Sequence, residues 1–320
     1  MKPAPFVHHA PRTVEEAVAV LAEVGHDGKV LAGGQSLIPI LNMRLASPGH
    51  LVDVNHVSGL GDITITPEAV RVGALVRHSG LERSEAAHAA LPLLRQAVVN
   101  VAHPAIRNRG TTVGSIVHAD AAGEMPAVLA LCDGTVEVVG ANGIREIGWH
   151  DFFLGALETV LRPDELAVAA RFNRMPPGTG TAFAESARRS GDYALAGVAV
   201  ALTVTDGVVS AAWASFVSVT DVPSVLDLTP VVGGHEARSG SFDNALDRAA
   251  EAVREHVAPE TDIHASADYR RMLVAELTRR ALPLAALHAT SPANDSFEVE
   301  RRGAPTRSLT NPSFDHHRVV

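Results

Sequence analysis

The segment Ala32-Gly33-Gly34-Gln35-Ser36 decides how the first part of this sequence is interpreted. It follows directly on a short stretch with the apolar pattern of a β-strand, and it contains two adjacent glycines. A glycine pair at a strand end lets the backbone turn tightly and approach another group closely. The segment therefore has two interpretations, a plain turn or a turn whose backbone amides approach a phosphate.

Three more specific kinds of glycine-rich site do not match this segment. A phosphate-binding P-loop needs a lysine before the hydroxyl residue, where this sequence has Gln35. The nucleophile elbow of serine hydrolases needs a glycine two positions after the serine, where this sequence has Ile38. A dinucleotide-binding fingerprint needs a third glycine at a fixed spacing, and that glycine is missing.

A second segment of small and hydroxyl residues lies farther along the chain, after Arg107 and Arg109. Its residues are Thr111, Thr112, Val113, Gly114 and Ser115. Two such loops are able to hold the two phosphates of a dinucleotide, and the arginines would add positive charge. A solvated basic turn is the alternative interpretation of this second segment.

Periodicity and turn residues predict the elements around both segments. Thr13 and Glu16 form a capping box, which predicts a helix over residues 17–23 that Gly25 ends. Asp206-Gly207 predicts a hairpin. The sequence also predicts helices over residues 91–101, 126–131, 242–256 and 266–288, and Ser266 is the expected N-cap of the last one. It predicts strands over residues 29–31, 51–54, 63–65, 69–73, 135–139, 166–172, 194–205 and 208–219. Residues 175–180, rich in proline and glycine, predict an internal boundary.

Composition excludes several classes of protein. With 320 residues, 46% of them hydrophobic, the chain is long enough for one large or two modest domains. A net charge of −9 argues against a basic surface for nucleic acid or anionic lipid. No apolar run reaches the roughly 18 residues that a membrane span needs, and no secretory signal is recognised, so a cytoplasmic location is expected. The one cysteine, Cys132, leaves no disulfide, cysteine-rich zinc site or iron–sulfur cluster on this chain.

Isolated polar residues are weaker candidates for a site. Glu124 is able to accept hydrogen bonds from ribose or ribityl hydroxyls, or simply begins a helix. Tyr193 stacks on a planar ring or begins a strand. His118 and Asp120 have no further ligands at metal spacing, so no metal site is predicted.

Several short segments between residues 6 and 282 match one family in order and spacing. They are residues 32–37, 51–55, 106–111, 114–115, 118–120, 124–127, 152–155, 188–193, 269–271 and 279–282, with Thr159, Leu161 and Pro163. Each is weak singly, but together they are specific. The sequence resembles the FAD-binding medium subunits of molybdenum hydroxylases, a family that includes carbon monoxide dehydrogenase and the flavin domain of xanthine dehydrogenase.

The resemblance implies an α+β fold. Residues 1–177 would form a two-lobed FAD-binding domain of the vanillyl-alcohol oxidase type, with lobes at about 1–58 and 59–177. Residues 178–288 would form a smaller α+β C-terminal domain of antiparallel sheet plus helices. Residues 289–320 are expected to be a disordered tail.

The resemblance also implies an FAD site with the diphosphate held between the two glycine segments. The implied FAD-binding residues are Ala32, Gly33, Gly34, Gln35, Ser36, Leu37, Thr111, Thr112, Val113, Gly114, Ser115, Glu124, Leu161 and Tyr193. It implies no catalytic side chain and no metal ligand on this chain. The redox chemistry would belong to the cofactor.

In such a family the partners are a large molybdenum-binding subunit and a small subunit with [2Fe-2S] clusters, in a heterotrimer that can dimerise. The flavin would pass electrons from those clusters to an external acceptor. The single cysteine agrees with this arrangement, because the chain alone cannot complete an electron relay. It also argues against the benzoyl-CoA reductase branch, whose medium subunit carries an extra cysteine-bound cluster.

Two positions depart from the family pattern. Val113 stands where relatives have a glycine, and Ala184 stands where relatives tend to have a lysine near the flavin. A branched side chain at Val113 is expected to crowd a phosphate, so reversion to glycine is expected to tighten FAD binding. Two further hypotheses therefore stay open, a stand-alone FAD oxidoreductase with the same fold and a flavin-free scaffold. The hydroxylated substrate and the final electron acceptor are not specified by these residues.

Overall fold

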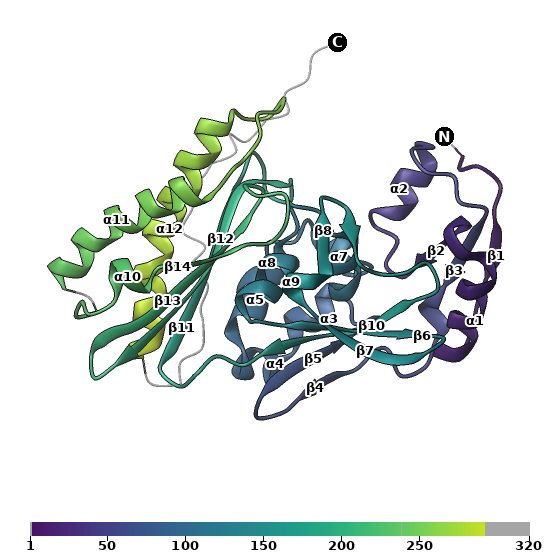
Figure 1. Ribbon diagram of the computed structural model, residues 1–320, viewed down its shortest axis with the longest axis horizontal. Helices are drawn as coiled ribbons and strands as arrows, with labels where there is room; N and C mark the ends of the chain where they lie inside the picture. Colours follow the sequence, from purple (N-terminus) through teal and green to yellow (C-terminus); the bar gives the residue numbers. More distant parts are fainter. Residues whose placement is uncertain (1, 238, 292–320) are drawn as a thin grey trace, which may run out of the picture. The chain divides into compact units, whose positions relative to one another are not determined.

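The computed structural model describes residues 2–237 and 239–291 of the chain (Figure 1). Residues 1–290 form one compact unit of sheets and helices. Within the described ranges, no helix combines the length and the apolar character that crossing a bilayer would require.

A small parallel sheet opens the fold. Its strand order is β1 (Val7–His9), β3 (His50–Asp53), β2 (Gly28–Leu31). Helix α1 (Val14–Val24) starts at the predicted capping box, where Thr13 Oγ1 accepts from the Glu16 amide at 3.1 Å. Short 3₁₀ turns, η1 (Gly25–Asp27) and η2 (Val54–His56), follow α1 and β3, and helix α2 (Leu37–Asn42) follows the glycine pair after β2.

A five-stranded antiparallel sheet forms the next layer, in the order β4-β5-β10-β6-β7. The strands are β4 (Ile63–Ile65), β5 (Ala69–Gly73), β10 (Leu166–Asn173), β6 (Thr135–Gly140) and β7 (Gly143–Gly148). The helices of this part are α3 (His78–Arg83), α4 (Glu85–Ala90), α5 (Pro92–Val98), α6 (Pro104–Arg107), α7 (Thr112–His118), α8 (Glu124–Leu131) and α9 (Trp149–Phe152). Helices α7 and α8 pack against β10, and α7 also meets the hairpin β8 (Phe153–Gly155) and β9 (Glu158–Thr159) (Figure 1).

The last part of the unit is a four-stranded antiparallel sheet, β11-β12-β13-β14, covered by helices. The strands are β11 (Thr179–Ala187), β12 (Ala194–Thr205), β13 (Val208–Val217) and β14 (Val225–Asp227), and the helices are α10 (Thr229–Val232), α11 (Gly240–His256) and α12 (Ala267–Thr290). The predicted turn joins β12 to β13, with Asp206 and Gly207 both at positive φ. Ser266 caps α12 as predicted, because its Oγ accepts from the Tyr269 amide at 3.2 Å.

The two faces of this second sheet belong to different cores. Along β12, Ala199 and Ala201 pack into the core of the five-stranded sheet and its helices, whereas Val198 and Val200 pack under α11 and α12. Side chains alternate across a strand, so odd positions face one core and even positions face the other. This parity decides below which side chains of β11 face the candidate site.

Three sequence predictions differ from the structure in extent. The predicted boundary at residues 175–180 contains the start of β11, a strand that its small residues did not signal and that pairing with β12 stabilises. The helix predicted over residues 91–101 is α5, which starts with Pro92 in its first turn and ends at Val98. The predicted tail begins too early, because α12 continues to Thr290; residues 292–320 lie outside the described residues.

Candidate functional site

The two small-residue segments lie in direct contact. A Cβ atom on Gly33 would lie 2.6 Å from the carbonyl oxygen of Arg109 and 2.7 Å from Cα of Gly110. Only a residue without a side chain fits at that distance. The next residue, Gly34, has a φ of +72°, in the left-handed region that favours glycine. The glycine pair is therefore required both by the turn and by the close approach of the second segment.

A cavity of about 370 Å³ opens at this contact. Its lining comes from the end of β2, the start of α2, the end of β3 and the loop before α7: Leu31, Ala32, Gly33, Gly34, Gln35, Ile38, Pro39, Asp53, Asn55 and Arg109. A volume of this size is in the range of small-molecule sites. The cavity thus includes the central residues of the first predicted segment and the arginine that precedes the second.

Asn55 organises the wall of this cavity. Its Nδ2 donates to the carbonyl of Ala32 at 2.9 Å and to Asp53 Oδ1 at 2.6 Å, and its Oδ1 accepts from Arg77 Nη2 at 2.5 Å. Burial acts to raise the pKa of Asp53, but the hydrogen bonds from Asn55 and from His8 outweigh it and lower that pKa. The Asp53 carboxylate therefore stays charged, and the segment after β2 is fixed through its own carbonyl.

Two arginines give the site positive charge. The Arg77 guanidinium donates to the carbonyl of Arg109 and to Asn55. Burial lowers the pKa of Arg77, and the nearby charge of Arg109 lowers it further. Arg109 is exposed, lines the cavity, and takes part in none of the ion pairs found among residues 2–237 and 239–291. Two like charges held together in this way favour a bound anion.

The sequence grouped Arg107 with Arg109, but the structure separates their roles. Arg107 is buried, pairs with Glu82 at 2.8 Å from Nε to Oε2, and donates to the carbonyls of Val101 and Ala102. Its charge is therefore neutralised inside the fold. Arg109 alone of the two is available to a ligand in the cavity.

The second segment forms the start of a helix instead of a loop. Thr111 is the N-cap of α7, and its Oγ1 accepts from the Gly114 amide at 3.1 Å. A Cβ atom on Gly114 would lie 2.5 Å from that Oγ1, so the cap needs a glycine there. Val113 is 2% exposed and belongs to the core around the five-stranded sheet. The expectation that its branched side chain crowds a phosphate is therefore wrong, because the side chain points into the core and its backbone is helical.

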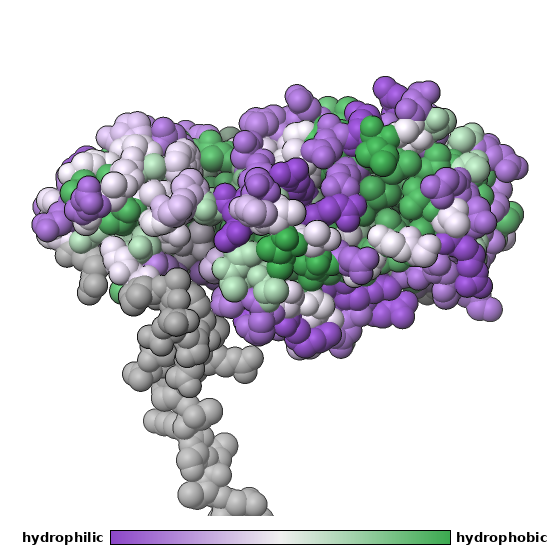
Figure 2. Space-filling view, turned by 90° about the horizontal axis from the view of Figure 1, so that it is seen from below, coloured by the Kyte–Doolittle hydropathy of each residue, from purple (hydrophilic) through white to green (hydrophobic). Residues whose placement is uncertain are grey.

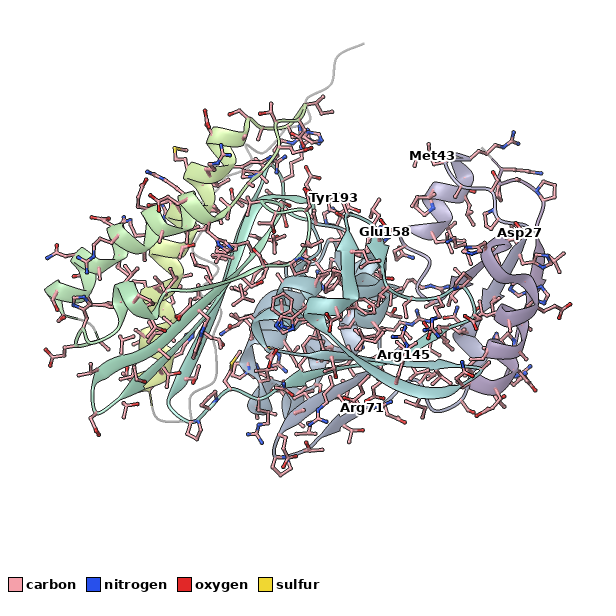
Figure 3. All side chains as sticks on the ribbon, viewed as in Figure 1. Asp27, Met43, Arg71, Arg145, Glu158 and Tyr193 are labelled. Carbon is pink, nitrogen blue, oxygen red and sulfur yellow. The ribbon has the colours of Figure 1, made fainter. Side chains whose placement is uncertain are left out.

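Of the predicted residues, Ala32, Gly33, Gly34 and Gln35 line the cavity, whereas Ser36, Leu37 and the segment from Thr111 to Ser115 do not. The remaining three lie farther along the chain. Glu124 begins α8, Leu161 is partly buried after β9, and Tyr193 stands before β12 with 69% of its surface exposed (Figure 3). None of the three lines the cavity. Burial raises the pKa of Tyr193, and the charges of Asp120 and Glu124 raise it further, which places Tyr193 near both carboxylates. Asp120, Glu124 and Tyr193 form a second, acidic region beyond the C-terminal end of α7.

Two glutamates in the acidic region hold protons unusually tightly. Burial, with a smaller contribution from Asp120, raises the pKa of Glu124 to about 7. Burial, with the neighbouring charge of Glu124, raises the pKa of Glu185 to about 8. Residues with such raised values cluster at functional sites. The sequence did not indicate Glu185, because nothing along the chain marks a glutamate in a strand as buried.

Ala184 and its neighbour Glu185 lie on opposite faces of β11. The Ala184 side chain packs on the face of β11 that is covered by helices, among the core under α11 and α12. Its neighbour Glu185 points to the other face, toward α8. The residue of β11 that faces the acidic region is therefore Glu185, whose carboxyl group has a raised pKa.

His118 and Asp120 do not belong to a metal centre in the described part of the chain. No group of three or more histidine, cysteine, aspartate or glutamate side chains that would hold a metal ion occurs among residues 2–237 and 239–291. Cys132 is buried, and burial raises the pKa of its thiol far above the ordinary value. Its role is packing, as its apolar surroundings indicate.

Sequence reasoning missed two polar residues of the cavity lining, Asp53 and Asn55, and it missed Arg77, which hydrogen-bonds to Asn55 and to the carbonyl of Arg109. Asp53 and Asn55 belong to a matching segment, and their position at the end of a parallel strand was a usable signal. Arg77 carried no signal, because it reaches the site from a loop that the sequence places far from both glycine segments.

Comparisons with known proteins identify the family of this chain. Residues 4–172 match the family model described as the FAD binding domain in molybdopterin dehydrogenase, and residues 181–285 match that of the CO dehydrogenase flavoprotein C-terminal domain. The nicotine 6-hydroxylase medium subunit of Paenarthrobacter nicotinovorans is 39% identical over 87% of this chain and 96% of its own length. The carbon monoxide dehydrogenase medium chain of Hydrogenophaga pseudoflava is 35% identical over 88% of this chain and 97% of its own length.

Solved structures give the same result. Quinoline 2-oxidoreductase from Pseudomonas putida 86 superposes with a TM-score of 0.85 at 34% identity, covering 91% of this chain and 100% of that one. A Cu,Mo-CO dehydrogenase superposes with a TM-score of 0.84 at 34% identity, covering 90% of this chain and 100% of that one. The predicted fold and family are confirmed, and this chain belongs to the FAD-binding medium subunits of multi-chain molybdenum hydroxylases.

Proposed function

We propose that this chain holds the FAD diphosphate where the glycine pair meets the Arg109–Thr111 backbone, and that its flavin relays electrons within a multi-chain hydroxylase. The observation that carries the proposal is the contact at Gly33. A Cβ atom there would overlap the Arg109 carbonyl, so two segments that are distant in sequence meet backbone to backbone beside a cavity.

The chemistry of the cavity wall fits a diphosphate. The exposed Arg109 guanidinium supplies charge-assisted hydrogen bonds, which are about twice as strong as neutral ones. Arg77 holds the Arg109 carbonyl and thereby fixes the second segment against the first. The segment from Ala32 to Gln35, with its two glycines, lines the cavity and leaves backbone groups accessible to a phosphate.

Helix α7 connects this cavity to the acidic region, and we assign the flavin ring to that region. Residues 112–118 span about 10 Å at 1.5 Å per residue. The ribityl chain of FAD would run along this helix, with Leu161 beside it. Tyr193 would lie against the ring, and Glu124 would meet the polar edge of the cofactor.

The bound flavin would supply two-electron redox chemistry that no side chain of this protein supplies. The protein's own residues bind, orient and set the charge around it. Because this sequence has one cysteine, and that cysteine is buried, the iron–sulfur clusters must come from another chain. We therefore propose a heterotrimer with a molybdenum-binding subunit and a [2Fe-2S] subunit, located in the cytoplasm.

Apolar surface agrees with the proposed partners. Leu154 and Leu157 on the β8–β9 hairpin are 59% and 61% exposed, and Tyr193 is exposed as well. Figure 2 shows apolar side chains gathered in patches on another face of the molecule, with polar residues around them. Patches of this kind mark protein contacts more often than lone apolar residues do.

The test is purification of the full chain together with the products of its neighbouring genes. The proposal predicts a yellow complex with stoichiometric FAD, molybdenum and iron, and FAD that stays with this chain after the complex is dissociated. A flavin-free complex, or flavin bound only to another chain, would contradict the proposal. A yellow chain that turns over substrate without partners would instead support the stand-alone oxidoreductase.

A further inference from the structure

The turn between helices α7 and α8, residues 119–123, joins three parts of the fold through its backbone. The carbonyl of Ala119 accepts a hydrogen bond from the amide of Leu157 at 2.8 Å, and Leu157 lies in the turn between β8 and β9. The carbonyl of Ala121 accepts from the amide of Ser218, also at 2.8 Å, and Ser218 directly follows β13. The α7–α8 turn therefore binds both the β8–β9 hairpin and the end of β13.

Three residues at these contacts have a strained backbone. The φ angles of Ala119, Leu157 and Ser218 are +52°, +61° and +63°, in the left-handed region. A side chain crowds the backbone there, which raises the free energy of any residue other than glycine. Seven non-glycine residues have a positive φ in the ranges 2–237 and 239–291, and three of them meet at this turn. Strained backbone persists only where its surroundings fix it, and it gathers at functional sites.

Two of the joined parts lead directly to residues that the proposed function assigns to the flavin. The α7–α8 turn runs into Glu124, the first residue of α8. The hairpin continues from Leu157 through β9 to Leu161, two residues after that strand ends. The hydrogen bond between Leu157 and Ala119 thus fixes the approach to Leu161 against the approach to Glu124.

The third part leads to Tyr193 through a buried arginine. The Arg270 guanidinium on α12 donates from Nη1 to the carbonyl of Leu195 at 2.6 Å and, over 3.5 Å, to the carbonyl of Ser218. Leu195 is the second residue of β12, and Tyr193 stands immediately before that strand. The end of β13 and the start of β12 are therefore held together, and Ser218 ties both to the α7–α8 turn.

We propose that the junction formed by Ala119, Leu157 and Ser218 positions the three flavin contacts relative to one another. The inference rests on the proposed function, because it needs the flavin ring to lie in the acidic region. The junction residues act through their backbones, so they are positioning residues. Glycine in their places would relieve the strain, but it would also let the backbone reach conformations that residues with a side chain do not adopt. The junction thus gives up stability and keeps the site rigid.

Two exposed leucines of one hairpin test the strain. Leu157 is 61% exposed and Leu154, in β8, is 59% exposed, so neither variant to glycine deletes a well-buried side chain. In the full chain, Leu157→Gly is expected to lower the unfolding equilibrium constant about threefold, because relief of the left-handed strain outweighs the freedom that glycine gives the unfolded chain. Leu154→Gly is the matched control and is expected to raise that constant about threefold, since glycine weakens a strand. The proposal is overturned if urea denaturation shows Leu157→Gly to be no more stable than the wild type.

Fluorescence lifetimes of bound FAD test the positioning role. An aromatic ring in contact with a flavin quenches flavin fluorescence, so a flavin held against Tyr193 gives one short lifetime. Leu157→Gly is expected to add a longer lifetime and to bind FAD about threefold more weakly, because the hairpin turn gains freedom. Leu157→Asn should keep the wild-type lifetime and affinity, since asparagine tolerates the left-handed region with less freedom than glycine. Unchanged lifetimes in Leu157→Gly would refute the positioning role.

Failure of the junction and failure of the proposed function give different results. A wild-type chain that binds no FAD would refute the proposed function, and the positioning role with it. The stability comparison between Leu157→Gly and Leu154→Gly needs no flavin, so it decides the strain in either case.

Discussion

The two ends of helix α7 have opposite electrostatic surroundings. At its start, the contact of Gly33 with Arg109 is fixed by Asn55 and Arg77, and the surplus charge is positive. Near its end, burial raises the pKa values of Glu124 and Glu185, and Glu185 Oε2 has no hydrogen-bond partner among the residues that the structure describes. The first end satisfies its polar groups, and the second leaves an oxygen atom unsatisfied.

This difference separates two expected roles, binding of the cofactor at the first end and adjustment of the charge near the cofactor at the second. A positively charged, hydrogen-bonded wall suits a permanent anion such as a diphosphate, whose charge does not change during turnover. Unsatisfied carboxyls change their protonation when the charge nearby changes, which suits a redox-active ring. Substitutions at the first end are therefore expected to act through packing. Substitutions at the second end are expected to act through the pH dependence of stability.

Substitution of Val113, which lies within helix α7, is expected to have the largest effect on stability. Val113→Gly deletes a buried side chain from α7 and adds a helix glycine, for a loss of about 3 kcal/mol in the free energy of unfolding. Urea denaturation of the full chain measures this loss, with Val99→Gly, which is 37% exposed, as the milder control. Tighter FAD binding by a fully stable Val113→Gly protein would show that the family glycine serves the cofactor instead.

The second largest effect is expected when the contact between Gly33 and the Arg109 backbone is crowded. In Gly33→Ala the new Cβ overlaps the Arg109 carbonyl, and overpacking of about 2 kcal/mol corresponds to roughly 30-fold weaker FAD binding. Fluorescence titration with FAD measures the affinity. Gly80→Ala is the matched control, because its Cβ would meet only Val76 Cγ1, at 4.0 Å. Equal affinities for the two variants would remove the close contact from the account of FAD binding.

Loss of a cavity cation has a smaller effect. Arg109→Ala is expected to weaken FAD binding about tenfold with little change in stability, since a hydrogen bond to a charged group contributes roughly 1.5 kcal/mol. The exposed Arg83→Ala should leave binding unchanged. Arg107→Ala should instead destabilise the fold, because it leaves Glu82 without its buried partner. If Arg109→Ala binds FAD as the wild type does, the ligand charge lies elsewhere.

The smallest expected effect is on the pH dependence of stability at the acidic end of α7. Between pH 5 and 8 the native state holds protons on Glu124 and Glu185 that the unfolded state has released, so these groups make stability fall as pH rises. His78 acts in the opposite direction below about pH 6.5, because burial lowers its pKa to about 4. Glu185→Gln should therefore gain on the order of 1 kcal/mol over the wild type from pH 5 to 8. A pH-independent difference in urea stability would contradict this.

Local signals predicted much of the fold correctly. The Thr13 capping box, the Asp206-Gly207 turn and the Ser266 cap each act over a few residues, and each is present in the structure. The family resemblance predicted the fold class, an FAD-binding domain followed by a C-terminal flavoprotein domain. The small-residue strand β11 and the helical start of the second glycine segment were not predicted, because pairing with β12 and the Thr111 cap decide them.

The site was less accessible to sequence reasoning. The glycine pair was recognised, but its contact with Arg109 depends on packing between segments that are distant in sequence. The separate roles of Arg107 and Arg109 depend on burial, which adjacent charges along a chain do not reveal. Glu185 was not recognised, because neighbouring residues of a strand face opposite sides and the sequence does not show which side of β11 meets the acidic region.

The most direct test of the diphosphate assignment is an experimental structure of the complex reconstituted with FAD. The account predicts diphosphate density within hydrogen-bonding distance of the backbone at Gly33 and Gly34 and of the Arg109 guanidinium, with the ring beside Tyr193. A diphosphate bound away from the Gly33 contact, or a reversed cofactor with the ring in the cavity, would contradict it.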